Sequence, residues 1–225
     1  MSTTLGFDVY GTLIDTQGVL STLEGMISGK AHAFSTTWRE KQLEYSFRRA
    51  LMQNYADFSV CTSQALEFCC ELYQVSLLPE QKQELLARYS ALPAFDDVAA
   101  SLSQLKGANF RLYAFSNGSA TAVDTLLSNA GIRTFFEGVV SCDEIQSFKP
   151  NPSVYRHFLA QTNTSLDRAW LVSSNSFDVI GARSAGMNAA WVKRSSTAVF
   201  DPWDIEPSVT IAGLGDLCEQ LLLSK

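Results

Sequence analysis

Polar side chains that could take part in catalysis follow several short apolar runs of this sequence. Asp8 ends the first run, Ser116 and Asn117 follow a later one, and Lys149 follows another after a short turn. A further run leads into Ser173-Ser174-Asn175-Ser176-Phe177-Asp178. An ionised aspartate surrounded by a cation and neutral hydrogen-bond donors suits covalent, nucleophilic catalysis. A single cluster of this kind is more often a turn, a solvated loop or a helix cap than a catalytic site. The clusters are informative because all of them follow predicted strands.

The elements that must position these side chains alternate between strand and helix. Beyond the first run, apolar segments predict strands at 110–115, 138–142, 169–172, 189–192 and 209–212. Amphipathic segments predict helices at 97–106, 120–130, 153–161, 178–185 and 216–223. This alternation predicts an α/β fold, a Rossmann-like doubly wound parallel sheet with helices on both faces. Ligand sites of such sheets lie at the carboxyl ends of the strands, where the polar clusters would meet.

Residues 16–92 offer no convincing strand. Apolar residues instead recur at helical spacing within 35–55, 62–75 and 79–92, and Pro79 suits the first position of a helix. We therefore predict a core domain of residues 1–15 and 93–225, and an all-helical cap domain of residues 16–92 inserted after the first strand. An insert at that point would lie over the carboxyl edge of the sheet and act as a lid.

Composition narrows the classes of partner, cofactor and location. A net charge of −6 argues against nucleic acid or an anionic membrane as partner. The five cysteines are odd in number and form no metal-binding motif, so we expect reduced, mostly buried thiols. Two histidines argue against a histidine triad or a zinc site. No leader-like segment opens the chain and no apolar run approaches membrane-spanning length, which predicts a cytoplasmic protein.

The motifs follow one another in a recognisable order. They are D-x-Y-G-T-L from Asp8, S-N-G from Ser116, K-P at Lys149 and S-S-N-x-x-D from Ser173. This order resembles the haloacid dehalogenase superfamily, and the match covers nearly the whole chain. The resemblance implies a Rossmann-like core, an inserted cap and an aspartate nucleophile on the first strand, which is Asp8 here.

Two positions indicate the branch of that superfamily. Most members are magnesium-dependent phosphatases with a second aspartate where this chain has Tyr10, and with Gly-Asp where it has Ser173-Ser174. A phenol is a poor general acid near neutral pH, and magnesium prefers carboxylate ligands. The sequence resembles instead the L-2-haloacid dehalogenases, which implies that no metal and no cofactor is used.

The resemblance to that branch implies a set of site residues. The implied catalytic residues are Asp8, Thr12, Arg39, Ser116, Lys149, Tyr155, Ser173, Asn175 and Asp178. The implied substrate-binding residues are Val9, Tyr10, Arg39, Leu43, Phe58, Ser116, Asn117 and Phe177.

Arg39 and its neighbours carry two further expectations. Thr37-x-x-Glu40 can be a capping box, with Ser35 or Thr36 as alternative caps, so we expect Arg39 in the first turn of a helix. The family usually has glutamine in place of Glu40 and often tryptophan in place of Phe177. Both positions adjoin the substrate pocket in that family, so these departures bear on substrate range.

The implied reaction is hydrolysis of short-chain L-2-haloacids to D-2-hydroxyacids. Asp8 would attack C2 and form an ester, Arg39 and Asn117 would receive the halide, and Asp178 would activate the hydrolytic water. Three alternatives stay open: a phosphatase for small phosphate esters, a hydrolase for a non-halogenated acid such as a strained cyclic amino acid, and a non-catalytic binding protein. Glu40 near the leaving group would favour the cyclic amino acid. The implied partner is a small-molecule 2-haloacid, and family analogy suggests a homodimer.

Overall fold

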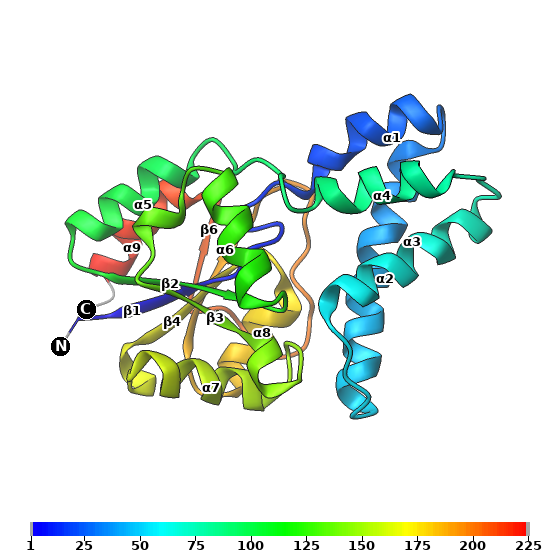
Figure 1. The fold of residues 1–225 in the computed structure, drawn as a ribbon. Helices are drawn as coiled ribbons and strands as arrows, with labels where there is room; N and C mark the ends of the chain where they lie inside the picture. Colours follow the sequence, from blue (N-terminus) through cyan, green and yellow to red (C-terminus); the bar gives the residue numbers. More distant parts are fainter. Residues whose placement is uncertain (1, 224–225) are drawn as a thin grey trace.

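A six-stranded parallel sheet forms the centre of the core (Figure 1). The structure is a computed structural model that describes residues 2–223 of the 225-residue chain. The strands are β1 Thr4–Phe7, β2 Arg111–Ser116, β3 Gly138–Ser141, β4 Ala169–Ser173, β5 Asn188–Val192 and β6 Val209–Ile211. Their spatial order is β3-β2-β1-β4-β5-β6, and each neighbouring pair is parallel. The predicted doubly wound sheet is therefore confirmed, and its strand order reverses direction between β1 and β4, where such folds bind ligands.

Helices surround this sheet and also form a separate group. The α-helices are α1 Leu20–Met26, α2 Ala31–Leu51, α3 Phe58–Leu72, α4 Pro79–Arg88, α5 Val98–Gly107, α6 Ala120–Asn129, α7 Pro152–Thr162, α8 Ser176–Ser184 and α9 Leu217–Leu223. Short 3-10 helices are η1 Thr16–Val19, η2 Arg133–Phe135, η3 Cys142–Ile145, η4 Leu166–Arg168 and η5 Leu214–Asp216. None of the helices within residues 2–223 has the length and apolar character needed to cross a membrane.

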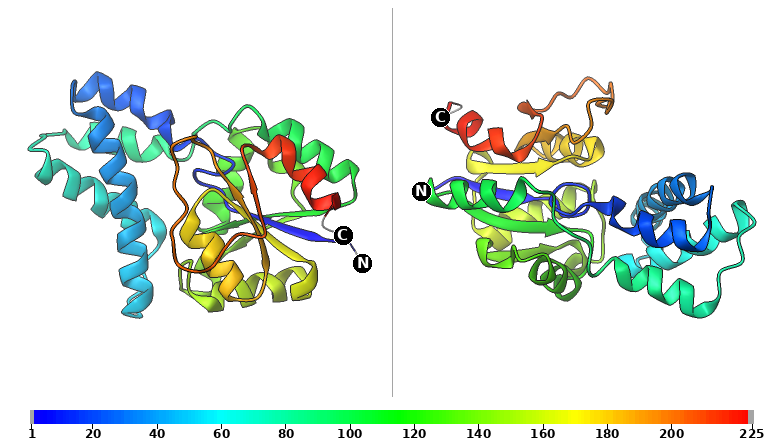
Figure 2. Two further views of the ribbon diagram at one scale, coloured as in Figure 1. Left: turned by 180° about the vertical axis from the view of Figure 1, so that it is seen from behind. Right: turned by 90° about the horizontal axis from the view of Figure 1, so that it is seen from above.

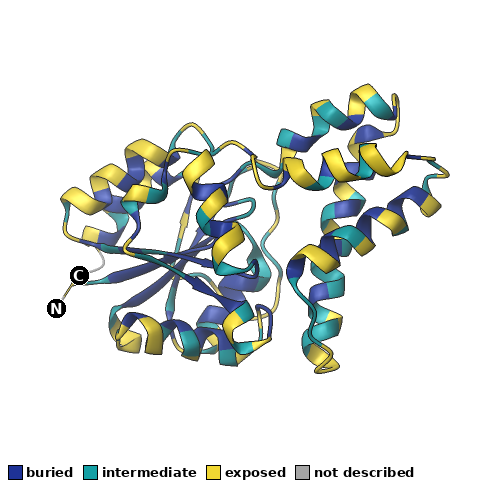
Figure 3. Ribbon diagram, viewed as in Figure 1, coloured by how far each residue is buried: buried dark blue, intermediate teal, exposed yellow. Residues whose placement is uncertain are grey.

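Alternate residues of each strand face opposite layers of helices. Leu5 and Phe7 pack in one cluster with apolar residues of α5, α6 and α9. Phe115 and Leu171 pack in a second cluster with residues of α7 and α8, on the other face of the sheet (Figures 1 and 3). The sheet is buried on both faces, which explains why its strands read as nearly continuous apolar runs.

Helices α1–α4 lie together beyond the carboxyl ends of the strands, and we call them the cap (Figures 1 and 2). Buried aromatic side chains hold them together: Phe34 and Trp38 of α2 pack edge-to-face, and the indole N–H of Trp38 donates to the Thr62 carbonyl of α3 at 2.8 Å. The helical character of this segment is confirmed, whereas the predicted domain limits at 15/16 and 92/93 stay a prediction.

The helix that carries Arg39 starts earlier than the capping box predicted. α2 begins at Ala31, after Gly29 in the left-handed region at φ +77°, so Arg39 lies in the middle of the helix and not in its first turn. The expectation was wrong because Ala31, Phe34 and Trp38 form a buried stripe that continues the helix towards its N-terminus. Sequence reasoning also assigned no helix to η1 or α1. Helix α1 is seven residues long and buries only Leu23, so it shows no apolar stripe in the sequence.

The expectation of reduced, buried cysteines agrees with the structure. All five cysteines are free thiols and are buried. The segment between β5 and β6 contains no helix or strand and runs along the core as a long loop, seen in orange in Figure 2. Its Phe200 packs edge-to-face on Trp191 of β5, which attaches the loop to the sheet.

Gly6 of β1 provides a test of the sheet–helix packing. A Cβ atom at this position would lie 2.7 Å from two ring atoms of Phe158, which is fully buried on α7. We expect Gly6→Ala to lower the free energy of unfolding by about 1–3 kcal/mol, because the ring must shift within a close-packed core. Urea denaturation measures this change.

Gly25→Ala is the matched control. Gly25 lies in helix α1 with no atom within 4 Å of an added Cβ, so the substitution should raise stability by about 0.5–1 kcal/mol. Equal effects of the two substitutions would contradict the described packing of α7 on β1.

Candidate active site

The Asp8 carboxylate follows β1 directly and is held by three side chains. Thr12 Oγ1 and Asn175 Nδ2 each donate to Asp8 Oδ2 at 2.8 Å. Lys149 Nζ donates to the other oxygen, Oδ1, at 3.2 Å. Asp8 itself is 8% exposed, so it is buried but still reaches the pocket described below. Two neutral donors and one cation therefore fix the orientation of the Asp8 carboxylate.

The loops after β1 and β4 bind each other and place two of these donors. Gly11 adopts φ +85° and turns the chain after Tyr10. Ser174 donates through its backbone N–H to Thr12 Oγ1 at 2.8 Å and through its hydroxyl to the Gly11 carbonyl at 2.7 Å. Thr12 is thus oriented to donate its own hydroxyl hydrogen to Asp8.

Lys149 lies between two carboxylates in the core. Its Nζ donates to Asp178 Oδ2 at 2.7 Å and to the Phe115 carbonyl at 2.8 Å, in addition to Asp8. Burial alone would lower the pKa of Lys149, but the charges of Asp178 and Asp8 outweigh it and raise that pKa, so the side chain is a cation. Burial raises the pKa of Asp178, and Lys149 opposes this effect.

Tyr155 holds the other oxygen of Asp178. Its hydroxyl donates to Asp178 Oδ1 at 2.8 Å, and burial followed by the Asp178 charge raises the pKa of Tyr155 well above its usual value. Gly181 of α8 makes this contact possible, because a Cβ there would collide with the Tyr155 hydroxyl. Ser173 lies nearby and accepts from the Asn175 backbone N–H at 3.1 Å.

Arg39 brings a second cation to the site from the cap. Its guanidinium donates to the Tyr10 carbonyl and to the Gln42 side-chain oxygen, each at 3.3 Å. No carboxylate lies within ion-pair distance of Arg39 in the described part of the chain. The guanidinium is therefore available to an anionic ligand. Sequence reasoning did not single out the fully buried Gln42, although its i+3 spacing places it on the same helix face as Arg39.

Asn117 and Ser116 follow β2. The side-chain oxygen of Asn117 accepts from the Lys149 backbone N–H at 2.8 Å, which leaves the NH₂ group as the end that can donate to a ligand. The Ser116 hydroxyl accepts from the Gly118 backbone N–H at 3.1 Å, so its hydrogen is free to point elsewhere. Within residues 2–223, the backbone N–H groups of Val9 and Tyr10 donate to no acceptor.

A small pocket at the junction of cap and core gathers most of the predicted residues. Its lining comprises Asp8, Tyr10, Arg39, Leu43, Phe58, Ser116, Asn117, Lys149, Asn175 and Phe177. Leu43 shares the face of Arg39 as expected, and Phe177 packs edge-to-face on Phe47 of the cap at 4.9 Å between ring centroids. The predicted residues Thr12, Ser173 and Asp178 lie behind this lining and contact it through hydrogen bonds, and Tyr155 lies one step further back, hydrogen-bonded to Asp178.

Two residues expected beside the substrate have side chains outside the pocket lining. The Val9 side chain is fully buried in the apolar core, so its part in substrate binding falls to its backbone N–H and stays a prediction. Glu40 is exposed and also lies outside the lining. Although it follows Arg39 in the sequence, it lies on the solvent-facing side of α2. The expectation that Glu40 adjoins the leaving group was wrong.

Tyr10 occupies the position at which a phosphatase carries its general acid. Burial raises the pKa of Tyr10 to about 12, and Arg39 only partly offsets this. The phenol is therefore neutral at physiological pH and too weak an acid to assist a leaving group there. Its ring instead forms an apolar part of the pocket wall.

Comparison with known proteins agrees with this geometry. A family model described as haloacid dehalogenase-like hydrolase matches residues 3–186. The chain belongs to the haloacid dehalogenase-like hydrolases. It is 35% identical, over 96% of its length and 92% of the relative, to an (S)-2-haloacid dehalogenase from Pseudomonas sp. (strain YL). The resemblance stated from the sequence motifs is therefore confirmed.

Solved structures place the chain in the same group of these hydrolases. The L-2-haloacid dehalogenase from Xanthobacter autotrophicus superimposes with a TM-score of 0.90 and 30% identity, over 99% of both chains. A second structure of that enzyme, with chloropropionic acid covalently bound, matches equally well, with a TM-score of 0.90. These enzymes share the core and helical cap described here, which confirms the predicted fold class.

Lys149→Met tests the electrostatics of the buried site. The substitution leaves the buried Asp178 and Asp8 without their shared cation, so we expect it to lower the free energy of unfolding at pH 7 by about 3–5 kcal/mol. Without Lys149, only the Tyr155 hydrogen bond opposes the effect of burial on Asp178, and the pKa of Asp178 rises further. A carboxyl whose pKa is raised on folding stabilises the fold at low pH and loses that contribution as pH rises.

The stability difference between Lys149→Met and the unsubstituted chain should consequently shrink as pH falls from 7 towards 4. Urea denaturation across this range measures it, and Lys106→Met on the exposed face of α5 is the control, expected to change stability by less than about 0.5 kcal/mol. A difference that grows towards acidic pH would contradict the assigned ion pair.

Proposed function

We propose that this hydrolase converts short-chain L-2-haloacids into D-2-hydroxyacids through a covalent ester on Asp8. One observation carries the proposal: Asp8 and Arg39 line the same pocket. The Asp8 carboxylate is oriented by hydrogen bonds, and Arg39 is a cation with no carboxylate partner among the described residues. The relatives are haloacid dehalogenases by name, and the Xanthobacter structure with covalently bound chloropropionic acid supports a covalent route.

Ester formation uses the less occupied oxygen of Asp8. Oδ2 already accepts hydrogen bonds from Thr12 and Asn175, whereas Oδ1 accepts one from Lys149, so we assign the attack to Oδ1. An Oδ1–C2 bond forms as the carbon–halogen bond breaks, and the halide leaves with the bonding electrons. Attack from the side opposite the halide inverts C2, which turns an L-acid into a D-product.

Two groups of donors would stabilise the charges of this step. Arg39 and the Asn117 NH₂ group receive the departing halide. The Ser116 hydroxyl and the backbone N–H groups of Val9 and Tyr10 hold the substrate carboxylate, consistent with the free N–H groups of this loop. Lys149, whose three ammonium hydrogens are already donated, attracts that carboxylate through its charge. Leu43, Phe58, Phe177 and the ring of Tyr10 would form the apolar wall that excludes bulk water while the ester forms.

Hydrolysis then occurs at the carbonyl carbon of the Asp8 ester and leaves C2 untouched. We assign Asp178 as the group that accepts the water's proton, with Asn175, Ser173 and Tyr155 in supporting positions. Both oxygens of Asp178 are bonded in the free enzyme, so the water must exchange with one of these bonds after the ester has formed. The C2–oxygen bond stays intact, the product alkoxide takes up a proton, and the Asp8 carboxylate is restored.

The donor set of the pocket supports a reaction without metal. The second-acid positions of a magnesium-dependent phosphatase are Tyr10 and Ser174 here, and the Lys149 ammonium already pairs with both Asp8 and Asp178. Within residues 2–223, no three acidic, histidine or cysteine side chains are grouped as metal ligands. Magnesium therefore finds no suitable carboxylate set at this site, and no step is assigned to it.

Two alternatives are less well supported. A phosphatase for small esters lacks its general acid, as Tyr10 illustrates. Hydrolysis of a strained cyclic amino acid was favoured by a Glu40 side chain near the leaving group. Glu40 is exposed and lies outside the pocket, so this support is absent. A cytoplasmic location and a homodimer, like the division into core and inserted cap, stay predictions of this account.

One parallel assay tests the proposed activity. We expect halide release from L-2-chloropropionate but not from the D-enantiomer, at a rate unchanged by a chelator, and no phosphate release from a generic phosphomonoester. Chelator-sensitive phosphate release without halide release would contradict the proposal and indicate the phosphatase.

Asp8→Asn tests the nucleophile. The amide keeps the size of the carboxylate but has no charge to attack C2, so kcat for halide release should fall by about a thousandfold or more. Asp216→Asn, at an exposed aspartate of η5, should leave kcat unchanged. An Asp8→Asn variant with nearly full activity would exclude the ester route, since no other carboxylate of the described chain lines the pocket.

A further inference from the structure

The catalytic pocket is too small for a substrate with a long side chain. Its free volume is about 10 Å³, which is near the minimum for a single water molecule. A 2-haloacid must therefore displace part of the wall, and each additional carbon of its side chain needs further space. The charged residues of the wall are at Arg39 and on the core side of the pocket. The opposite side is formed by the apolar rings of Tyr10 and Phe58, and opening space there costs the least free energy.

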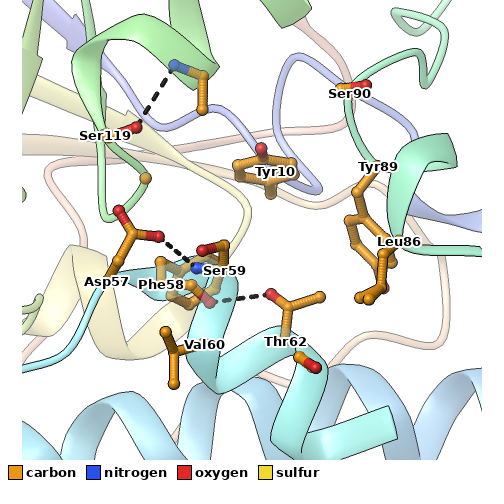
Figure 4. Close-up of a pocket in the computed structure, with 13 residues that line it drawn as sticks. Tyr10, Asp57, Phe58, Ser59, Val60, Thr62, Leu86, Tyr89, Ser90 and Ser119 are labelled. Carbon is orange, nitrogen blue, oxygen red and sulfur yellow. Dashed lines mark hydrogen bonds between the residues drawn. The ribbon is translucent and has the colours of Figure 1, made fainter. Parts of the chain in front are cut away.

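A larger hollow lies directly behind these two rings. It has a free volume of about 410 Å³ and lies between α3 and α4 of the cap and the start of α6 in the core (Figure 4). We call it the side hollow; it is lined by Tyr10, Asp57, Phe58, Ser59, Val60, Thr62, Ser63, Leu86, Tyr89, Ser90, Gly118, Ser119 and Ala122. Tyr10 and Phe58 line both cavities, so they form a shared wall.

The shared wall consists of two aromatic rings that pack against each other at a tilt. The ring centroids of Tyr10 and Phe58 are 6.2 Å apart with a tilt of 38°, and Tyr10 lies 6.4 Å from Tyr89 on the other side. Gly118 has no side chain, and a Cβ there would come within 3.8 Å of the Tyr10 ring and 3.7 Å of the Ser116 hydroxyl. Gly118 therefore places no side chain against the Tyr10 ring on the side of the larger hollow.

Charge sets the direction in which a 2-haloacid would lie across this wall. The catalytic pocket holds the cations Arg39 and Lys149. Among the described residues that line the side hollow, Asp57 is the one with a charge, and its carboxylate caps α3 by accepting from the Ser59 backbone N–H at 2.6 Å. An anionic head group is attracted to the first cavity and repelled from the second, whereas an alkyl chain is accommodated by the neutral lining.

We propose that the side hollow is the binding site for the alkyl side chain of longer 2-haloacids, reached when Tyr10 and Phe58 move apart. The inference rests on the proposed dehalogenation and extends it to a substrate class, acids whose chain continues several carbons beyond C2. In such a complex the carboxylate and halide stay beside Arg39 and Lys149, and the chain passes between the two rings. The chain then contacts Leu86 of α4, Tyr89 directly after that helix, and Val60 of α3.

Filling the hollow without touching the catalytic pocket tests this inference. Ala122 is exposed on α6 and lines only the side hollow, so Ala122→Trp should place an indole in it without disturbing the core. We expect kcat/KM for L-2-bromooctanoate to fall at least about tenfold, while the value for L-2-bromopropionate stays within about twofold. Thr121→Trp, on the same helix, equally exposed and outside the lining, is the matched control and should change neither value.

Ser63→Trp fills the hollow from the cap and should reproduce the result if Ala122→Trp proves unstable. Equal losses for both substrates would overturn the inference and identify the hollow as a common entry route, and no loss for either would show that the chain lies elsewhere. If the unsubstituted enzyme releases bromide from the propionate but not from the octanoate, this inference alone fails. If it releases bromide from neither, the proposed function fails.

Discussion

The ammonium group of Lys149, buried between Asp8 and Asp178, is the interaction on which the site depends. Removing three charged groups from water costs several kcal/mol per ion, and only close, well-directed hydrogen bonds offset that cost. The structure supplies them: the Phe115 carbonyl takes one ammonium hydrogen, and the Tyr155 hydroxyl satisfies the far oxygen of Asp178. The result is an Asp8 carboxylate at the pocket that is oriented and only partly occupied by hydrogen-bond donors.

Several apparently ordinary features of the fold serve this arrangement. The reversal of strand order between β1 and β4 brings the Asp8 loop against the Ser174 loop, which binds Thr12 and Gly11. Gly181 leaves room for the Tyr155 hydroxyl beneath α8. The cap then supplies Arg39, a cation that has no carboxylate partner in the described chain. Helix α2 places its guanidinium over the end of the sheet, where it donates to the Tyr10 carbonyl. Neither part alone forms the pocket.

The sequence predicted the core well and the cap only in outline, for physical reasons. Strands buried on both faces give continuous apolar runs, so β2 and β4 could be located to within one residue. The polar clusters could then be recognised by their positions after the predicted strands. The start of α2 was misplaced because a capping motif at Thr37 is a local signal, whereas the buried stripe through Ala31 and Phe34 is set by tertiary packing. Which residues touch the pocket was also not readable from order alone: Asp178 and Ser173 lie behind it, and Glu40 points to solvent.

The central claim is that the Asp8 carboxylate, and not a water molecule, attacks C2. A single turnover in heavy-oxygen water, with enzyme in excess over L-2-chloropropionate, separates the two routes most directly. We expect the heavy oxygen to enter the Asp8 side chain, detected by the mass of the peptide that contains it, and the first hydroxyacid formed to carry ordinary oxygen. Heavy oxygen in that first hydroxyacid, with an unlabelled Asp8 peptide, would contradict it.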